Sequence, residues 1–171
     1  SDYGTHKEML QDLLMFYSST EKKLVSLSEY VDRMKEDQKY IYFATGENAS
    51  AIDTLPQTEL IRSKGYEILY CTEDVDEFTM QTLMQYKEKK FCSATNDDLG
   101  IENDAENTEK KEENDALLTF VKETLGDKVA EVTASKKLVS HPVCLTAKGG
   151  ISFEMEKYFN AVQPNAGMKA E

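Results

Sequence analysis

The chain has 171 residues, of which 32 are acidic and 20 basic, so its formal net charge at pH 7 is -12. A surface of this charge repels phosphate groups, which argues against nucleic acid and anionic membranes as main partners. No apolar run approaches the ~20 residues that a membrane-spanning helix needs, and the N-terminus lacks the pattern of a signal peptide. The three cysteines form no C-x-x-C pair and fit a reducing compartment, so we expect a cytoplasmic protein.

The N-terminal part, residues 1–35, predicts two helices. Apolar residues recur at three- and four-residue steps over 5–19, which predicts the first helix. Ser26 and Glu29 have the spacing of a capping box, in which the serine caps a helix and the glutamate bonds back to the cap. We therefore expect a second, short helix that runs through Met34.

Residues 36–100 alternate between strand-like and helical patterns. Runs of β-branched and aromatic residues predict strands, and apolar spacing of three to four residues between them predicts helices. The predicted strands cover 39–45, 67–71 and 90–94, and the predicted helices cover 49–55, 57–64 and 74–86. This alternation is typical of a small parallel sheet with helices on both faces. We therefore expect a three-layer α/β unit.

The composition changes near residue 97, where most side chains become polar and acidic. We interpret 101–115 as a polar acidic connector and 116–171 as a second, incomplete α+β unit. The elements predicted for this unit are a helix that ends at Gly126, a β-hairpin over 129–147 and an amphipathic helix over 151–162. Because the chain also begins at Ser1 rather than at a methionine, we expect it to be a piece of a longer protein.

Signatures of catalysis are absent from the sequence, which has no glycine-rich phosphate loop, no G-x-S-x-G elbow and no C-x-x-C or H-E-x-x-H metal pair. Two weak patterns leave a ligand-binding or metal site possible as an alternative. Thr45 and Gly46 follow a predicted strand, where ligands bind in open α/β sheets. Four acids after the next strand could hold Mg²⁺ or simply begin a helix; they are Glu73, Asp74, Asp76 and Glu77. We expect no catalytic site, cofactor or metal in this chain, and a nucleotide- or Mg²⁺-binding regulatory domain is the alternative.

The last predicted helix carries a continuous apolar stripe on one side. Its members are Ile151, Met155, Tyr158, Phe159 and Val162. A stripe of this kind is normally buried against a core, and the helix would then be part of a structural spacer. Methionine and aromatic side chains on a mobile amphipathic helix also suit the adaptable recognition of other proteins.

Several long motifs closely resemble the heat-shock protein 90 chaperones of the bacterial HtpG type. The first two are LSEYVDRMK at 27–35 and KYIYFATG at 39–46. The next two are LIRSKGYEILY at 60–70 and TEDVDEF at 72–78. The similarity continues through LGDKV at 125–129 and LVSHP at 138–142, so it covers nearly the whole chain with order and spacing kept.

This resemblance implies an ATP-dependent chaperone with an N-terminal ATP domain, a middle domain and a C-terminal dimerisation domain. The chain would hold the end of the middle domain, including its small α/β subdomain, and the start of the C-terminal domain. ATP and Mg²⁺ would bind upstream of it. The helices that pair two protomers into a homodimer would lie downstream of Glu171. The partners implied are non-native client proteins, and no nucleic acid or membrane.

The family also implies where clients bind. A helix of the C-terminal domain projects apolar residues into the dimer cleft, and the matching positions are Ile151, Met155 and Tyr158. In the middle domain, the helix after the second strand of the α/β subdomain offers an aromatic side chain to the same cleft. This aromatic matches Phe78, with Gln81 one turn further on. These five residues are the candidate client-binding residues.

Overall fold

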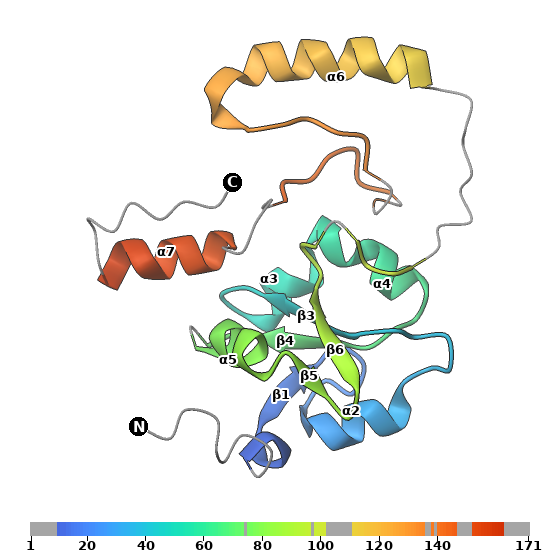
Figure 1. Ribbon diagram of the computed structural model, residues 1–171, viewed down its shortest axis with the longest axis vertical. Helices are drawn as coiled ribbons and strands as arrows, with labels where there is room; N and C mark the ends of the chain where they lie inside the picture. Colours follow the sequence, from blue (N-terminus) through green and yellow to red (C-terminus); the bar gives the residue numbers. More distant parts are fainter. Residues whose placement is uncertain are drawn as a thin grey trace.

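A mixed six-stranded sheet organises the chain in a computed structural model that describes residues 10–73, 75–96, 98–101, 111–135, 138, 140–146 and 152–162 (Figure 1). The strands are β1 (Met15–Ser18), β2 (Leu24–Ser26), β3 (Ile41–Thr45), β4 (Ile68–Cys71), β5 (Gln85–Tyr86) and β6 (Lys89–Ser93). Their spatial order is β2-β1-β4-β3-β6-β5. The central strands β4, β3 and β6 are parallel, and the outer strands pair antiparallel. The predicted α/β class is confirmed, with a sheet that is parallel only at its centre.

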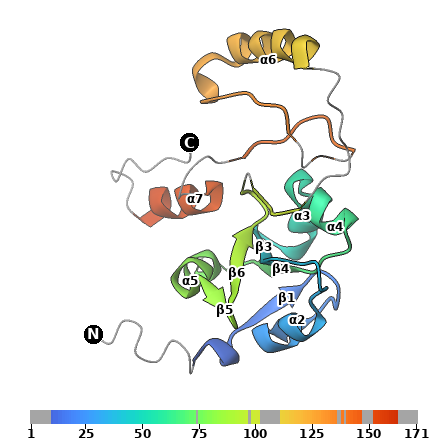
Figure 2. The same ribbon diagram turned by 45° about the vertical axis from the view of Figure 1, so that its right-hand side comes forward.

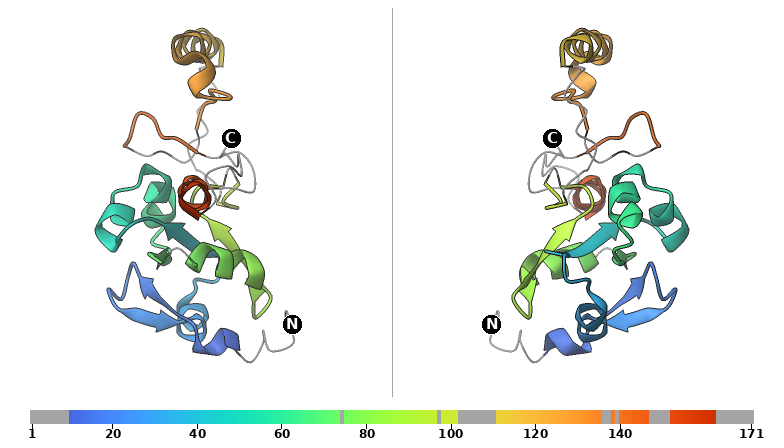
Figure 3. Two further views of the ribbon diagram at one scale, coloured as in Figure 1. Left: turned by 90° about the vertical axis from the view of Figure 1, so that its left-hand side faces the viewer. Right: turned by 90° about the vertical axis from the view of Figure 1, so that its right-hand side faces the viewer.

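Helices cover both faces of this sheet, as the predicted three layers require (Figure 3). They are α2 (Leu27–Arg33), α3 (Ala49–Asp53), α4 (Glu59–Ser63) and α5 (Asp76–Leu83), with short 3-10 turns η1 (Gln11–Leu13) and η2 (Pro56–Thr58). Side chains from α2 and α5 pack with Ile41 and Phe43 on one face. Side chains from α3 and α4 pack with Tyr42 and Ala44 on the other, because successive strand residues point to opposite faces.

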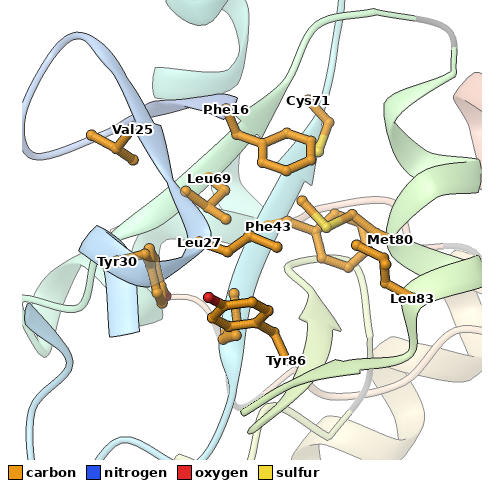
Figure 4. Close-up of a cluster of buried hydrophobic side chains, with 11 residues drawn as sticks. Phe16, Val25, Leu27, Tyr30, Phe43, Leu69, Cys71, Met80, Leu83 and Tyr86 are labelled. Carbon is orange, nitrogen blue, oxygen red and sulfur yellow. The ribbon is translucent and has the colours of Figure 1, made fainter. Parts of the chain in front are cut away.

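The core between α2, α5 and the sheet is built from large apolar side chains (Figure 4). Leu27 and Tyr30 come from α2, and Met80 and Leu83 come from α5. The predicted capping box is confirmed: the Glu29 N–H donates to Ser26 Oγ at 3.2 Å, and the Ser26 N–H donates to the Glu29 carboxylate at 2.8 Å.

The helix predicted over 5–19 is wrong at Met15–Ser18, which form the strand β1, whereas Gln11–Leu13 form the helical turn η1. An apolar run as short as Leu14–Tyr17 fits a strand as well as a helix, so periodicity cannot distinguish them. Tertiary pairing decides: β1 lies between β2 and β4 and completes their backbone hydrogen bonds. Its Ser18 hydroxyl also donates to the buried Glu67 carboxylate, at 2.6 Å.

The C-terminal part contains α6 (Lys111–Leu125), the 3-10 turn η3 (Gly126–Lys128) and α7 (Phe153–Val162). The views in Figures 1 and 2 show α6 apart from the sheet and α7 beside α5. The β-hairpin predicted over 129–147 is wrong for the residues of this segment that are described, which include no strand. At Ser140 the backbone N–H bonds to a side chain and not to a neighbouring strand: it donates to Glu59 Oε1 of α4 at 2.8 Å. No described helix is long and apolar enough to span a bilayer.

Candidate functional site: the seam between α5 and α7

A cleft opens at the carboxyl ends of β3 and β4, where α5 and α7 come together. The chain leaves β3 through Gly46 and Glu47 and leaves β4 through Thr72 and Glu73, and all four residues line the cleft. Gly46 is needed there, because a Cβ at this position would lie 2.8 Å from Ile52 Cγ1. Glu77 from α5 adds to this side, and α7 supplies Glu154, Met155 and Tyr158 on the other.

The helix α5 presents two different surfaces. Met80 and Leu83 point into the core, which fixes the rotation of the helix on the sheet. Phe78 and Gln81 are three residues apart and therefore lie on one face of the helix, turned from the core. Phe78 is half-buried and Gln81 is exposed. This second face is the one that α7 meets.

Ser152 begins α7 and also joins it to α5. Its hydroxyl oxygen accepts the N–H of Met155 at 3.1 Å, the contact of an N-cap residue with the third residue of a helix. The same hydroxyl donates to the Glu77 carboxylate at 2.5 Å. One serine therefore satisfies a free N–H of the helix end and gives a buried carboxylate a hydrogen-bond partner.

Apolar side chains close the rest of the seam. Gln81 Nε2 donates to the Met155 sulfur at 3.1 Å, and Met155 is only 6% exposed. The Phe78 ring centroid lies 5.6 Å from that of Tyr158 and 5.7 Å from that of Phe159. Both pairs have the inclined, edge-to-face geometry that aromatic rings favour.

Acidic side chains dominate the charge of the cleft. Burial raises the pKa of Glu77 above its ordinary value, the Ser152 hydrogen bond opposes this rise, and the nearby Glu154 adds to it. Burial likewise raises the pKa of the Cys71 thiol, which is the reverse of what a reactive thiolate needs. With Glu47 and Glu73 also on the lining, the site repels phosphate rather than binding it.

The structure therefore brings together four of the five predicted client-binding residues: Phe78, Gln81, Met155 and Tyr158. The fifth, Ile151, lies outside the described residues. Sequence reasoning missed the contact between Glu77 and Ser152, because the two residues are 75 positions apart and no local pattern links them. Glu77 is explained locally as an acid in the first turn of a helix, which the helix dipole favours, and Ser152 as a helix cap.

The alternative sites have little support in the geometry. Among the acids of the proposed Mg²⁺ cluster, Asp74 lies outside the described residues, and Asp76 accepts the N–H of Glu73 at 3.1 Å as part of the turn that begins α5. No group of three or more potential metal ligands converges within the described ranges. The cleft beside Thr45 and Gly46 carries four glutamates and does not fit the phosphates of ATP.

Comparison with known proteins identifies the family. The family model described as "Hsp90 protein" matches residues 2–170. The Chaperone protein HtpG of Clostridium acetobutylicum is 60% identical over 172 residues, which are 100% of this chain and 28% of that protein. The Chaperone protein HtpG of Halalkalibacterium halodurans is 56% identical, over 100% of this chain and 28% of its own length. The chain thus spans about 28% of the length of these relatives.

A solved structure supports the same conclusion. The middle domain of a putative heat shock protein from Plasmodium falciparum matches with a TM-score of 0.53 and 31% identity, over 56% of this chain and 40% of that one. The resemblance of the motifs, the match of the family model over nearly all residues and this structural likeness agree. The chain belongs to the Hsp90 family of chaperones.

Proposed function

We propose that this chain is a client-binding segment of an Hsp90-type chaperone and that the seam between α5 and α7 is its client site. One observation carries the proposal. Phe78 and Gln81 from one helix meet Met155 and Tyr158 from another, although more than 70 residues separate them in the chain. Aromatic rings and a flexible thioether that can repack suit partners of varied sequence.

In this proposal the chain contributes binding and no catalysis. ATP and Mg²⁺ would act in other parts of a longer, homodimeric protein, because the acidic cleft described above is a poor phosphate site. Cys71, Cys92 and Cys144 are thiols rather than members of disulfides, which fits a cytoplasmic location. Partners would be non-native proteins that expose apolar segments.

The proposal is tested by binding of ribonuclease A that has been reduced and blocked with iodoacetamide, with native ribonuclease A as the folded control. We expect Tyr158→Asp to weaken binding of the unfolded form about tenfold, because a lost aromatic contact costs ~1.5–3 kcal/mol and ~1.4 kcal/mol is tenfold. Ala161→Asp adds the same charge at an exposed position of the same helix and should leave binding within about twofold. Equal effects of the two variants would contradict the site.

A further inference from the structure

The two halves of the proposed client site cover each other. Met155 reaches Gln81 and is nearly buried, and the rings of Tyr158 and Phe159 pack on Phe78. A client segment that used these apolar surfaces would have to replace contacts that the chain already makes with itself. In this conformation the site is therefore occupied by its own helix.

Among the described residues, α7 docks on α5 through one end of the helix. The contacts to α5 described above come from its first two turns, through the side chains of Ser152, Met155, Tyr158 and Phe159. Beyond them, Asn160, Ala161 and Val162 are exposed. A helix held by a few side chains at one end can separate from its neighbour without disturbing the sheet.

Charge opposes this docking. Glu47, Glu73 and Glu77 line the cleft on the side of the sheet and α5, and α7 brings Glu154 to the same cleft. Lys157 pairs with Glu154 at 2.9 Å on α7 itself and also attracts Glu47 across the cleft, which offsets part of the repulsion. The hydrogen bond from Ser152 to Glu77 links the buried end of α7 directly to a carboxylate of this acidic wall, beside the weaker bond from Gln81 to the Met155 sulfur.

We infer that docked α7 is the closed state of the client site, a self-occluding lid that the Ser152–Glu77 hydrogen bond holds shut and that must lift before a client binds. This inference rests on the proposed function, since it concerns the same surface. It predicts that weakening the link opens the lid and raises, rather than lowers, the affinity for clients. A lid in equilibrium between two states reduces apparent affinity by the fraction that is open.

The test uses two substitutions at Ser152 in the whole chain. Ser152→Asp keeps an oxygen that can cap α7 but places a second carboxylate against Glu77. Ser152→Asn also caps the helix and in addition offers an amide N–H to Glu77, so it is the matched control. Hydrogen exchange of the α7 amides reports opening, and binding of reduced, blocked ribonuclease A reports access to the site.

For Ser152→Asp we expect α7 to exchange about tenfold faster, equivalent to ~1.4 kcal/mol of docking free energy, and to bind the unfolded probe more tightly. Ser152→Asn should stay closer to the wild type in both measurements, and exchange in β3 and β4 should be unchanged. Unaltered α7 exchange in Ser152→Asp would overturn the role of the hydrogen bond. Faster exchange with unchanged or weaker binding would overturn occlusion. Failure of the client site itself would show as equal binding by Ser152→Asp with and without Tyr158→Asp, because the lid is open in both and only the Tyr158 contact differs.

Discussion

The hydroxyl of Tyr30 makes a sharply testable contribution to the fold that supports the site. Tyr30 is 0% exposed, and its hydroxyl donates to the backbone carbonyl of Glu67 at 2.7 Å. It accepts from Gln38 Nε2 at 2.8 Å and from the N–H of Tyr42 at 3.0 Å. One oxygen thus links α2 to β3 and to the residue that precedes β4, with its donor and both acceptor positions in use.

Replacing Tyr30 by Phe removes this oxygen and leaves the ring packing in place. Gln38 keeps a second acceptor, the carbonyl of Tyr40 at 2.8 Å. The N–H of Tyr42 and the carbonyl of Glu67 lose this partner inside the protein. A buried group left without its hydrogen bond costs ~1–3 kcal/mol, so two such groups predict a loss of about 2–4 kcal/mol if the backbone relaxes in part.

Urea unfolding followed by circular dichroism measures this loss as a lower midpoint with an unchanged slope. Tyr66→Phe is the matched control, because the Tyr66 hydroxyl donates to the Asp37 carboxylate at 2.8 Å in a partly buried site. There we expect a smaller loss of about 1.5 kcal/mol, the lower end for a hydrogen bond to a charged group, because water can replace the hydroxyl at this partly buried carboxylate. Equal losses for the two variants would refute the reasoning that buried partners are left unsatisfied.

Three further predictions concern the capping box and the docked helix. Ser26→Ala should lower the free energy of unfolding by ~0.5–2 kcal/mol in the same urea assay, because it removes a capping-box acceptor; a change below ~0.2 kcal/mol would argue against the cap. Burial raises the pKa of Glu77, and α7 adds to this rise by covering the carboxylate and by bringing Glu154 near it, so we expect the docked state to bind the Glu77 proton more tightly. Docking should therefore strengthen as the pH falls through that raised pKa and weaken above it. Exchange of α7, corrected for intrinsic rates, measures this, and a pH dependence that persists in Glu77→Gln would contradict it. Met155→Ala removes a nearly buried side chain from the seam and should speed α7 exchange at least about tenfold, since a buried Met→Ala change costs ~2–5 kcal/mol. The exposed Val162→Ala should not, and equal exchange in both variants would show that Met155 does not hold the seam.

Helices and strands were predicted correctly where the residue pattern fits only one kind of secondary structure. The aromatic and β-branched run before Gly46 is the strand Ile41–Thr45, and the capping box begins α2 as expected. The prediction failed at Met15–Ser18, because a short apolar run fits the repeat of a helix as well as that of a strand. Pairing with the neighbouring strands makes this segment a strand. The hairpin prediction also failed for the described residues between 129 and 146, because two patterned stretches form a hairpin only if their backbones pair.

The candidate site could be predicted only in part, for a related reason. The apolar stripe of α7 is visible in sequence, but nothing local says what it packs against. The family resemblance supplied Phe78 and Gln81 as residues of the same site, and the structure places both beside α7. The contact between Glu77 and Ser152 depends on how two helices far apart in the chain pack together, which the spacing of residues along the sequence does not predict.

Photo-cross-linking tests the client site most directly. A photoreactive phenylalanine analogue would replace Tyr158 in the seam, or Lys90, which is exposed on β6 away from it. Each protein would be irradiated with reduced, blocked ribonuclease A and, separately, with native ribonuclease A. We expect cross-links to the unfolded form from position 158 and few from position 90. Equal cross-linking from the two positions, or cross-linking from position 90 alone, would contradict it.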